Sequence, residues 1–459
     1  MSKVLLLSPP TPWDSYVVQS ELYPNLSIIM LGTILNNAGH QAKVVHMLAD
    51  KVTMPKLQDL ILDFEPDIVG ITMVTFQAKT SREIMNVIRT VKRQSVRIVI
   101  GGPHPSALGN LALSTFPDAD IAVIGEGDEA MVRIADGEIK HGILYPQEIQ
   151  DLDSLPIPNL NLINLKRFSG IYPPGPMPSF NICGSRGCPY NCKFCSRSAM
   201  GNHLRFRSPQ NIIQEIMTLH RKHGIREFFF QDDTFNVNRQ WLNELLNLII
   251  TYRLNKGIVY RARCRVNEKL IDAKLLKLMK QAGIWEIFYG VENGNQAMLD
   301  SMNKGITIAE IKRAFRLTRQ AGIKTEASFI IGMPGETEKT IKDSLKLWDS
   351  IDPDWCSFSR LIPFPGTQVE QELRQKGHLL VDNPEDFVLE KTLVRTDKMS
   401  TDELEACAVM IGKLVTNDKL MRMLKNPAEL ARTAKDMMKS RKSIVKGMSK
   451  LWQLAFGVK

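Results

Sequence analysis

The chain has 459 residues, of which 44% are hydrophobic and 24% are charged. This balance is typical of a globular protein with a substantial core, and the length corresponds to roughly two or three domains. No apolar run approaches the length of a membrane span, and the run in MSKVLLLSPP is too short for the core of a signal peptide. We therefore expect a cytoplasmic protein, in which clustered cysteines serve metal binding or catalysis instead of disulfides.

The formal net charge is +10. A positive balance of this size can serve a nucleic acid, an anionic lipid or an acidic substrate, but it can also be a solvated surface. Lysine and arginine form no long run, and basic residues are not interleaved with aromatic ones as in readers of single-stranded RNA. We favour a solvated surface, place a polyanionic partner second, and expect no nucleic-acid partner.

Residues 3–127 alternate short buried-looking runs with helical patterns. The runs cover residues 3–9, 42–48, 67–74, 97–103 and 121–127, and the helical pattern over residues 26–39 ends at Gly39. Strands that alternate with helices predict an α/β fold with a doubly wound, Rossmann-like parallel sheet, which we assign to residues 1–140.

Three turns lie where strands of this sheet end: Ser8-Pro9-Pro10, Gly101-Gly102-Pro103-His104 and Gly125-Glu126-Gly127. Ligands of such sheets bind beyond the carboxyl ends of the strands, and glycines let the backbone approach a bulky ligand closely. The alternative is that they are simple tight turns between strands and helices. No GxGxxG fingerprint with an acidic partner is present, which argues against a nicotinamide dinucleotide.

A second α/β series follows a proline-rich linker over residues 141–178. Six runs, at residues 179–185, 227–233, 259–266, 286–292, 325–334 and 356–365, predict a partial (β/α)6 barrel over residues 179–370. One helix is expected to begin at Ser208-Pro209 and to end at Gly224. The working face of a barrel lies at the carboxyl ends of its strands, where polar side chains cluster: Asp232, Asp233, Arg265, Asn267, Glu292, Asn293 and Glu336.

Residues 371–459 predict a C-terminal helical region rich in lysine and methionine. Within it, KSIVKGMSKLWQLAF (442–456) places apolar residues on one helical face and lysines on another. We favour a helix packed on the barrel; the alternative is a peripheral membrane helix, because basic amphipathic helices with aromatic residues bind at interfaces.

Four of the seven cysteines lie in CGSRGCPYNCKFC, residues 183–195. Cys188, Cys192 and Cys195 have the spacing CxxxCxxC in a loop after the first barrel strand, and three thiolates of one loop can bind three irons of a 4Fe-4S cluster. Structural zinc is the competing interpretation, but it takes four ligands in paired spacing. Cys183 lies within a strand, and nothing motivates the distance to His203. Buried apolar cysteines are a poorer interpretation, because polar residues and a proline interrupt any core pattern.

The cysteine motif, with Phe194 before its last cysteine, resembles that of the radical S-adenosylmethionine (SAM) superfamily. Further stretches follow in the order shown by the cobalamin-dependent branch of that superfamily: RFRSP, FFQDDTFN, FYGVENG, MNKGIT, FIIGMPGET and FPGT. In the N-terminal half, PNL, GGPHPSA and IGEGDEA resemble the cobalamin-binding domain of this branch. The resemblance covers residues 3–370, and the C-terminal helices carry no family signal.

The resemblance implies three cofactors: a 4Fe-4S cluster, SAM and cobalamin. The three cysteines would bind three irons, and the fourth iron would take the amino and carboxylate groups of SAM, which one electron cleaves to methionine and a 5′-deoxyadenosyl radical. The residues expected around SAM are Phe194 and Ile331 to Glu336 for the adenine, Glu292 for the ribose, Arg263 or Arg265 for the carboxylate, and Asp232 at the barrel mouth. The alternative role of Glu292 is a salt bridge, and that of Asp232 is helix capping.

Many cobalamin domains carry an Asp-x-His-x-x-Gly signature whose histidine binds cobalt. The corresponding region here, SPPTPWDSYV (8–17), contains no histidine. We therefore expect cobalamin without a protein histidine on cobalt, and we expect His104, which follows the fourth strand, to be a wall residue. The residues expected around cobalamin are Ser8, Thr72, Thr75, Gly101, Gly102, Pro103, His104, Gly125 and Glu126.

The resemblance favours a methyltransferase that moves a methyl group from SAM, via cobalamin, to an unactivated carbon or phosphorus. The alternative is a cyclase or rearrangement enzyme similar to the anaerobic porphyrin-ester cyclases, whose FFQDDTF and RFRSP stretches are matched equally well. A non-catalytic iron–sulfur or zinc protein is a distant third. The expected partners are a small-molecule or peptide substrate and an electron donor such as flavodoxin or ferredoxin.

Overall fold

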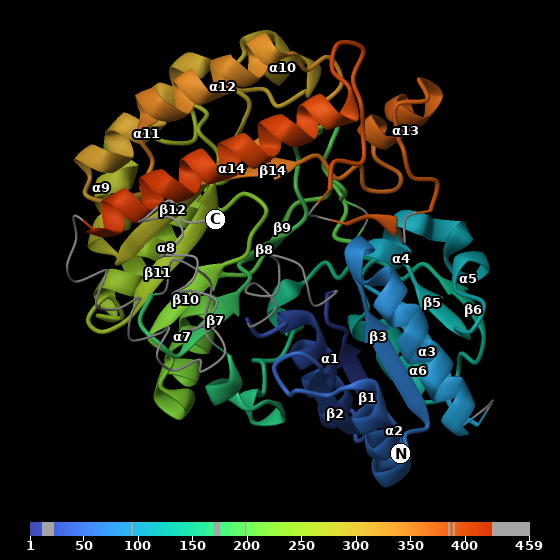
Figure 1. Ribbon diagram of the computed structural model, residues 1–459. Helices are drawn as coiled ribbons and strands as arrows, with labels where there is room; N and C mark the ends of the chain where they lie inside the picture. The colour runs from blue at the N-terminus through green and yellow to red at the C-terminus, as the bar shows by residue number, and fades with distance from the viewer. Residues whose placement is uncertain are drawn as a thin grey trace. The chain divides into compact units, whose positions relative to one another are not determined.

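The computed structural model describes residues 1–11, 23–92, 95–168, 175–197, 199–383, 386–388 and 391–424. The chain divides into two compact units, Met1–Glu405 and Ala406–Lys459. The first unit contains both predicted α/β regions (Figure 1). In the second unit, the described residues continue the helix α14 (Thr401–Leu424).

The first region is a six-stranded parallel sheet with the order β2-β1-β3-β4-β5-β6. Its strands are β1 (Lys3–Ser8), β2 (Gln41–His46), β3 (Ile68–Thr72), β4 (Arg97–Gly101), β5 (Ile121–Val123) and β6 (Gly142–Leu144). The helices between them are α1 (Leu26–Asn37), α2 (Met54–Phe64), α3 (Ala78–Lys92), α4 (Pro103–Leu108), α5 (Ala112–Thr115) and α6 (Asp128–Ala135) (Figure 1). The predicted doubly wound sheet is confirmed.

Strand β1 shows why this sheet carries helices on both faces. Its side chains alternate between two apolar clusters: Val4 and Leu6 pack in one, and Leu5 and Leu7 pack in the other. A strand whose two faces are both covered has a continuous apolar run instead of an alternating one, as VLLL has. The helix α1 begins at its cap Asn25, whose side chain accepts a hydrogen bond from the Ser27 amide.

The second region is a six-stranded parallel sheet whose strands follow the chain order from β7 to β14. They are β7 (Ser179–Ile182), β10 (Glu227–Phe230), β11 (Val259–Cys264), β12 (Ile284–Glu292), β13 (Lys324–Ile331) and β14 (Trp355–Arg360). The intervening helices are α7 (Pro209–His223), α8 (Arg239–Thr251), α9 (Ala273–Gln281), α10 (Gln296–Ser301), α11 (Ile308–Gln320) and α12 (Glu338–Ile351), and α13 (Gln368–Gln375) follows the last strand. This arrangement confirms the predicted partial barrel, including the helix capped by Ser208 and ended at Gly224.

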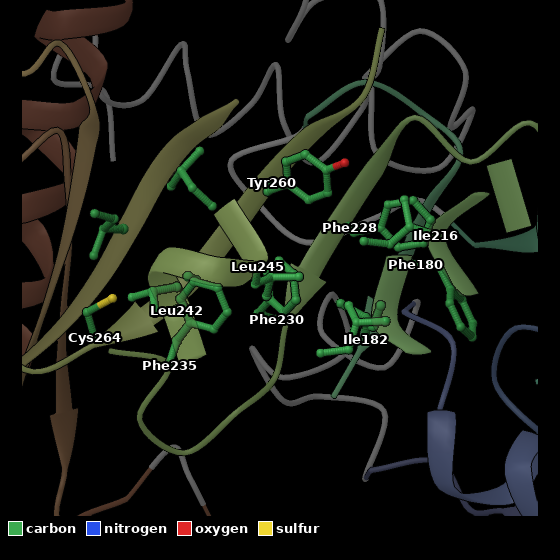
Figure 2. Packing of buried hydrophobic residues seen from close by; sticks show 14 of the residues in the cluster. Phe180, Ile182, Ile216, Phe228, Phe230, Phe235, Leu242, Leu245, Tyr260 and Cys264 are labelled. Atoms are coloured by element: carbon green, nitrogen blue, oxygen red, sulfur yellow. The ribbon is translucent and has the colours of Figure 1, made fainter. Parts of the chain in front are cut away.

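Helices α7 and α8 cover one face of the barrel strands with aromatic and aliphatic side chains. Figure 2 shows Phe228 and Phe230 of β10 and Tyr260 of β11 packed among residues of these helices. The alternate residues of β11, among them Arg261 and Arg263, therefore point to the other face, toward the barrel interior. Sequence alone did not decide in which direction the arginines point.

Three structural features lie near the expected domain boundaries. The first sheet continues past residue 140, because β6 pairs with β5. The linker is no loose connection: it contains three short 3-10 helices, and Leu152 and Leu160 are buried. The region after residue 370 is not wholly helical, because α13 ends before Gly377, which has φ 63°, and the chain then forms a bridge between Leu379 and Val394.

Candidate functional site

A short two-stranded ribbon frames the segment that carries the cysteine motif. Its strands β8 (Ser185–Arg186) and β9 (Arg205–Phe206) are antiparallel and close the base of residues 187–204, here called the cysteine loop. At the start of this loop Gly187 has φ 88°, and a Cβ atom there would lie 2.2 Å from the carbonyl oxygen of His203. Only glycine fits this close approach.

The three cysteines of the CxxxCxxC motif have different environments. Cys192 is buried, Cys188 is half-buried and Cys195 is exposed, and the Cys195 amide donates a 3.2 Å hydrogen bond to the carbonyl of Cys192. Within the described residues, no three His, Cys, Asp or Glu side chains converge closely enough to hold a single metal ion. Their assignment as ligands of three irons stays a prediction that depends on the spacing in the loop.

Cys183 and Asp232 brace the connection between β7 and the ribbon. The Asp232 carboxylate accepts hydrogen bonds from the Gly184 amide at 3.1 Å and the Ser185 hydroxyl at 2.5 Å, and the Cys183 thiol donates to the Ser185 carbonyl at 2.9 Å. Burial raises the pKa of Asp232 to about 6 and that of Cys183 to about 12. Asp232 is fully buried and does not border the cavity described below, whereas its neighbour Asp233 does. The placement gives Asp232 a bracing role.

Arg265 holds the cysteine loop against the end of β11. Its Nη1 lies 3.8 Å from the Cys192 sulfur, and its guanidinium lies 3.7 Å from the centre of the Tyr190 ring. Its other donors bind Asn267 Oδ1 and the Lys304 carbonyl. Each of the three guanidinium nitrogens of Arg265 thus has a partner within the protein.

Arg263 has the opposite character, although it was the other residue expected at the SAM carboxylate. Its guanidinium lies over the rings of Phe229 and Phe288, at 5.3 and 5.9 Å from their centres, and it borders the cavity. Asp233 borders the same space and is exposed, as Arg263 is. Partial burial raises the pKa of Asp233, while the charge of Arg263 opposes the rise. Both side chains are therefore available to a ligand.

Glu292 forms a buried ion pair with Lys304. The two side chains are each 9% exposed and lie 2.6 Å apart, and the Lys304 ammonium is 5.7 Å from the centre of the Phe194 ring. Glu292 has φ 68°, and a Cβ at Gly290 would lie 2.4 Å from the Glu292 carboxylate, so glycine leaves the room for this pair. The salt-bridge alternative for Glu292 is present, and the pair lies beside the cysteine loop.

Ile331 ends β13, and Glu336 lies in the turn that follows the strand. Glu336 is 1% exposed, and its carboxylate accepts hydrogen bonds from the Gly332 amide at 2.6 Å and the Asn293 side chain at 3.0 Å. Burial raises the pKa of Glu336 to about 7. Ile331 is 4% exposed and its carbonyl accepts from the Leu361 amide. Both residues shape the turn; the part of the turn that would meet adenine stays a prediction.

The Glu292–Lys304 pair makes a stability prediction. Lys304→Met leaves the Glu292 carboxylate buried without its partner, so we expect the free energy of unfolding to fall by about 3–5 kcal/mol. The double variant Glu292→Gln/Lys304→Met removes both charges and should recover most of the loss. Urea unfolding of the three proteins measures the difference; a single variant within about 0.5 kcal/mol of wild type contradicts the pairing.

A cavity of about 730 Å³ lies at the carboxyl ends of the first sheet. Seven of the nine residues expected around cobalamin line it: Ser8, Thr72, Gly101, Gly102, Pro103, Gly125 and Glu126. They end or follow β1, β3, β4 and β5, as the topology requires, because parallel strands end at one edge of the sheet. Barrel and ribbon residues complete the wall, including Arg186, Gln231, Asp233 and Arg263. One space is therefore shared by both α/β regions.

Thr75 and His104 do not line this cavity, and their contact with cobalamin stays a prediction. They bind one another, with 3.2 Å between Thr75 Oγ1 and His104 Nδ1, and His104 is fully buried against the edge of Phe116. The amide of His104 donates to the Met73 carbonyl. The pair fastens the loop after β3 to α4 and lies behind the wall.

The glycines of this edge fit a bulky planar ligand. Gly102 has φ 93°, and a Cβ there would lie 2.7 Å from the Thr72 hydroxyl. Gly125 has φ 104° and no atom within 4 Å of its Cβ position, and Gly101 has only ordinary contacts there. Bare backbone therefore faces the cavity, and a large ligand can approach it closely.

Several cavity residues had not been anticipated. His46 ends β2, directly beside Ser8, and is 3% exposed; burial lowers its pKa to about 4, so its imidazole is neutral at pH 7. Gln231 and Asn181 hydrogen-bond one another on the barrel side. Their positions at the carboxyl ends of strands were the available signal, but the relative placement of the two sheets was not readable from the sequence.

No helix in the described part of the chain is long and apolar enough to cross a membrane. The amphipathic segment 442–456, for which an interfacial helix was the alternative, lies outside the described residues.

Each of the two α/β regions matches a known family. Residues 182–347 match the Radical SAM superfamily, and residues 18–135 match the B12 binding domain. The first match includes the cysteine loop and the four barrel strands β10 to β13, and the second includes most of the first sheet.

Two curated relatives are each 30% identical to this chain. One is an uncharacterized methyltransferase of Pyrococcus horikoshii, with 83% of this chain and 85% of that protein covered. The other is the anaerobic magnesium-protoporphyrin IX monomethyl ester cyclase of Cereibacter sphaeroides, with 80% of this chain and 63% of that protein covered. Among solved structures, the cobalamin-dependent SAM radical enzyme OxsB with aqua-cobalamin and SAM bound is similar in fold, with a TM-score of 0.72, 17% identity, and 96% of this chain and 71% of that chain covered. This chain belongs to the radical SAM enzymes that carry an N-terminal B12-binding domain.

Proposed function

We propose that this enzyme is a cobalamin-dependent radical SAM methyltransferase that methylates an unactivated carbon or phosphorus. The observation that carries the proposal is the single cavity bordered both by the glycine turns of the first sheet and by Asp233 and Arg263 of the barrel. A ligand on the first sheet and a substrate in the barrel share one space there, as transfer between them requires.

The cofactors are those of the family: a 4Fe-4S cluster, SAM and cobalamin. Cys188, Cys192 and Cys195 are the cluster ligands, and the glycines at positions 101, 102 and 125 form the cobalamin cradle. When bound, the cluster with SAM supplies radical abstraction of hydrogen from an unactivated C–H bond, and cobalamin supplies a methyl carrier.

The chain itself orients SAM and the substrate in the cavity. Arg263 offers a guanidinium, held over two aromatic rings, to a carboxylate or another anion of SAM or substrate. Asp233 offers an acceptor on the same wall. The rings of Phe229 and Phe288 support the guanidinium of Arg263 and so orient it at the cavity wall.

The cyclase reaction is the second candidate, because a magnesium-protoporphyrin ester cyclase is as similar in sequence as a methyltransferase. Both reactions use the same cofactors in this proposal, so the residues of the cavity wall do not distinguish a methyltransferase from a cyclase. The two are distinguished by whether the methyl group of SAM is transferred.

The test is an anaerobic reaction of the reconstituted holoenzyme with cobalamin, a reductant and SAM that carries a deuterated methyl group, followed by mass spectrometry. We expect labelled methyl on the bound cobalamin together with S-adenosylhomocysteine and 5′-deoxyadenosine. If 5′-deoxyadenosine forms alone while cobalamin stays bound, the methyltransferase proposal fails and the cyclase leads.

The partners we propose are a small-molecule or peptide substrate and a flavodoxin- or ferredoxin-like electron donor. None of the seven cysteines, all of which lie in the described residues, forms a disulfide, and we propose a reducing compartment such as the cytoplasm.

A further inference from the structure

Two arginines of the β8–β9 ribbon bind acidic residues of the first α/β region. Arg186 of β8 lies two residues before Cys188, and Arg205 of β9 is its direct cross-strand partner. The ribbon therefore presents two neighbouring guanidinium groups at the base of the cysteine loop. Their acceptors are Glu126, in the loop after β5, and Asp128, the first residue of α6.

The contacts are numerous and directional. Arg186 binds Asp128 with both terminal nitrogens, at 2.8 and 3.2 Å, and binds Glu126 at 2.9 Å. Arg205 binds the other oxygen of Glu126 at 2.5 Å and the Ile149 carbonyl at 2.6 Å. The side chains are between 3% and 13% exposed. Two positive and two negative charges thus form the buried centre of the cluster, and the more exposed Glu148 lies 3.7 Å from Arg205 Nε at its edge.

Such a cluster has a defined geometry because each charge needs its partners. Burial alone would raise the pKa of Glu126, but the Arg205 hydrogen bond and the Arg186 charge outweigh it and hold the pKa below its usual range. Buried pairs are screened little by salt. Loss of one partner leaves the others desolvated and unpaired, so the arrangement resists gradual shifts.

The position of the cluster links the two cofactor sides of the cavity. Glu126, Asp128, Arg186 and Gly187 all border the cavity, and Gly125, next to Glu126, is part of the glycine cradle. A displacement of the ribbon moves the base of the cysteine loop, and a displacement of the loop after β5 moves the cradle. The cluster fixes one relative to the other.

We infer that Arg186 is a positioning residue that sets the separation between the cysteine loop and the cobalamin cradle. This inference rests on the proposed function. The inference also gives Glu126 a different role from the expected contact with cobalamin. Its carboxylate accepts hydrogen bonds from Arg186 and Arg205 and is therefore not free for cobalamin. A correct separation favours methyl loading of cobalamin over unproductive cleavage of SAM.

The test compares wild type with Arg186→Gln, Arg186→Lys and Asp128→Asn. Iron and cobalamin per chain are measured first, and then the ratio of labelled methyl on cobalamin to 5′-deoxyadenosine after reaction with deuterated SAM. We expect wild-type loading but a ratio that falls by about tenfold or more in Arg186→Gln, since small displacements of reacting groups have large effects. Arg186→Lys should restore this ratio only partly, because lysine cannot form the two-point contact with Asp128.

Asp128→Asn keeps the shape of the cluster, so this variant tests the positioning role of Arg186 if Arg186→Gln does not fold. An unchanged ratio in loaded variants overturns the inference, and so does lost cofactor loading in all of them, because the role would then be stability alone. A wild type that gives no labelled cobalamin refutes the proposed function instead. In that case the inference is tested by microwave power saturation of the cob(II)alamin EPR signal with the cluster reduced. Equal relaxation of the cobalt signal in wild type and variants overturns the inference.

Discussion

Replacement of Cys188, Cys192 or Cys195 by alanine abolishes the visible absorbance of the cluster and all reductive cleavage of SAM. Two remaining thiolates hold a cluster of four irons poorly, and no fourth cysteine can take the missing position, since Cys183 lies before the loop with its thiol bound to the Ser185 carbonyl. The measurement is the absorbance and iron content of the anaerobically reconstituted variants, together with 5′-deoxyadenosine released from SAM.

Cys183→Ala is the matched control, because it removes a thiol from the same segment without touching the motif. We expect a normal cluster and normal SAM cleavage. A cluster lost in Cys183→Ala would make Cys183 a ligand. SAM cleavage retained in any single variant of the motif would contradict the radical SAM assignment of these cysteines.

Gly101→Leu should weaken cobalamin binding by about 100-fold or more while the cluster still forms. Gly101 ends β4 at the edge of the cavity, its φ is not positive, and the position of a Cβ there is 3.8 Å from the nearest atom. The backbone therefore accepts a side chain, but a branched one takes up space that the ligand needs. Binding is measured by titration of apo-protein with cobalamin, and folding by thermal unfolding.

Gly101→Ala is the control for that variant. A single methyl group makes only van der Waals contacts at this position, so we expect stability within about 1 kcal/mol of wild type and cobalamin affinity reduced far less than in the leucine variant. Equal cobalamin affinity in wild type and Gly101→Leu would contradict the placement of the ligand in this cavity.

The fold was predictable because its signals are local. Apolar runs such as VLLL and EFFF, separated by helical patterns and clear caps, specify strands and helices within a few residues. The ends of parallel strands then predict where ligands bind, and most residues expected around cobalamin do line the cavity. The cysteine motif was readable for the same reason, since one short loop carries it.

The finer site was not predictable because it depends on which side chains meet across the fold. Arg263 and Arg265 are equivalent in sequence pattern, yet one is occupied by Tyr190 and the cysteine loop and the other faces the cavity. Asp232 and Asp233 divide in the same way between a buried brace and the cavity wall. These differences arise from strand register and from loops that return to the site from far along the chain.

The most direct test of the account is whether the cluster and cobalamin lie near one another in the same protein. EPR power saturation of cob(II)alamin is measured in the holoenzyme with the cluster oxidised and then reduced, with Cys192→Ala as the protein that lacks the cluster. The account predicts that the cobalt signal relaxes faster when the cluster is reduced in wild type and not in Cys192→Ala. Relaxation of the cobalt signal that is independent of the cluster would contradict a shared cavity.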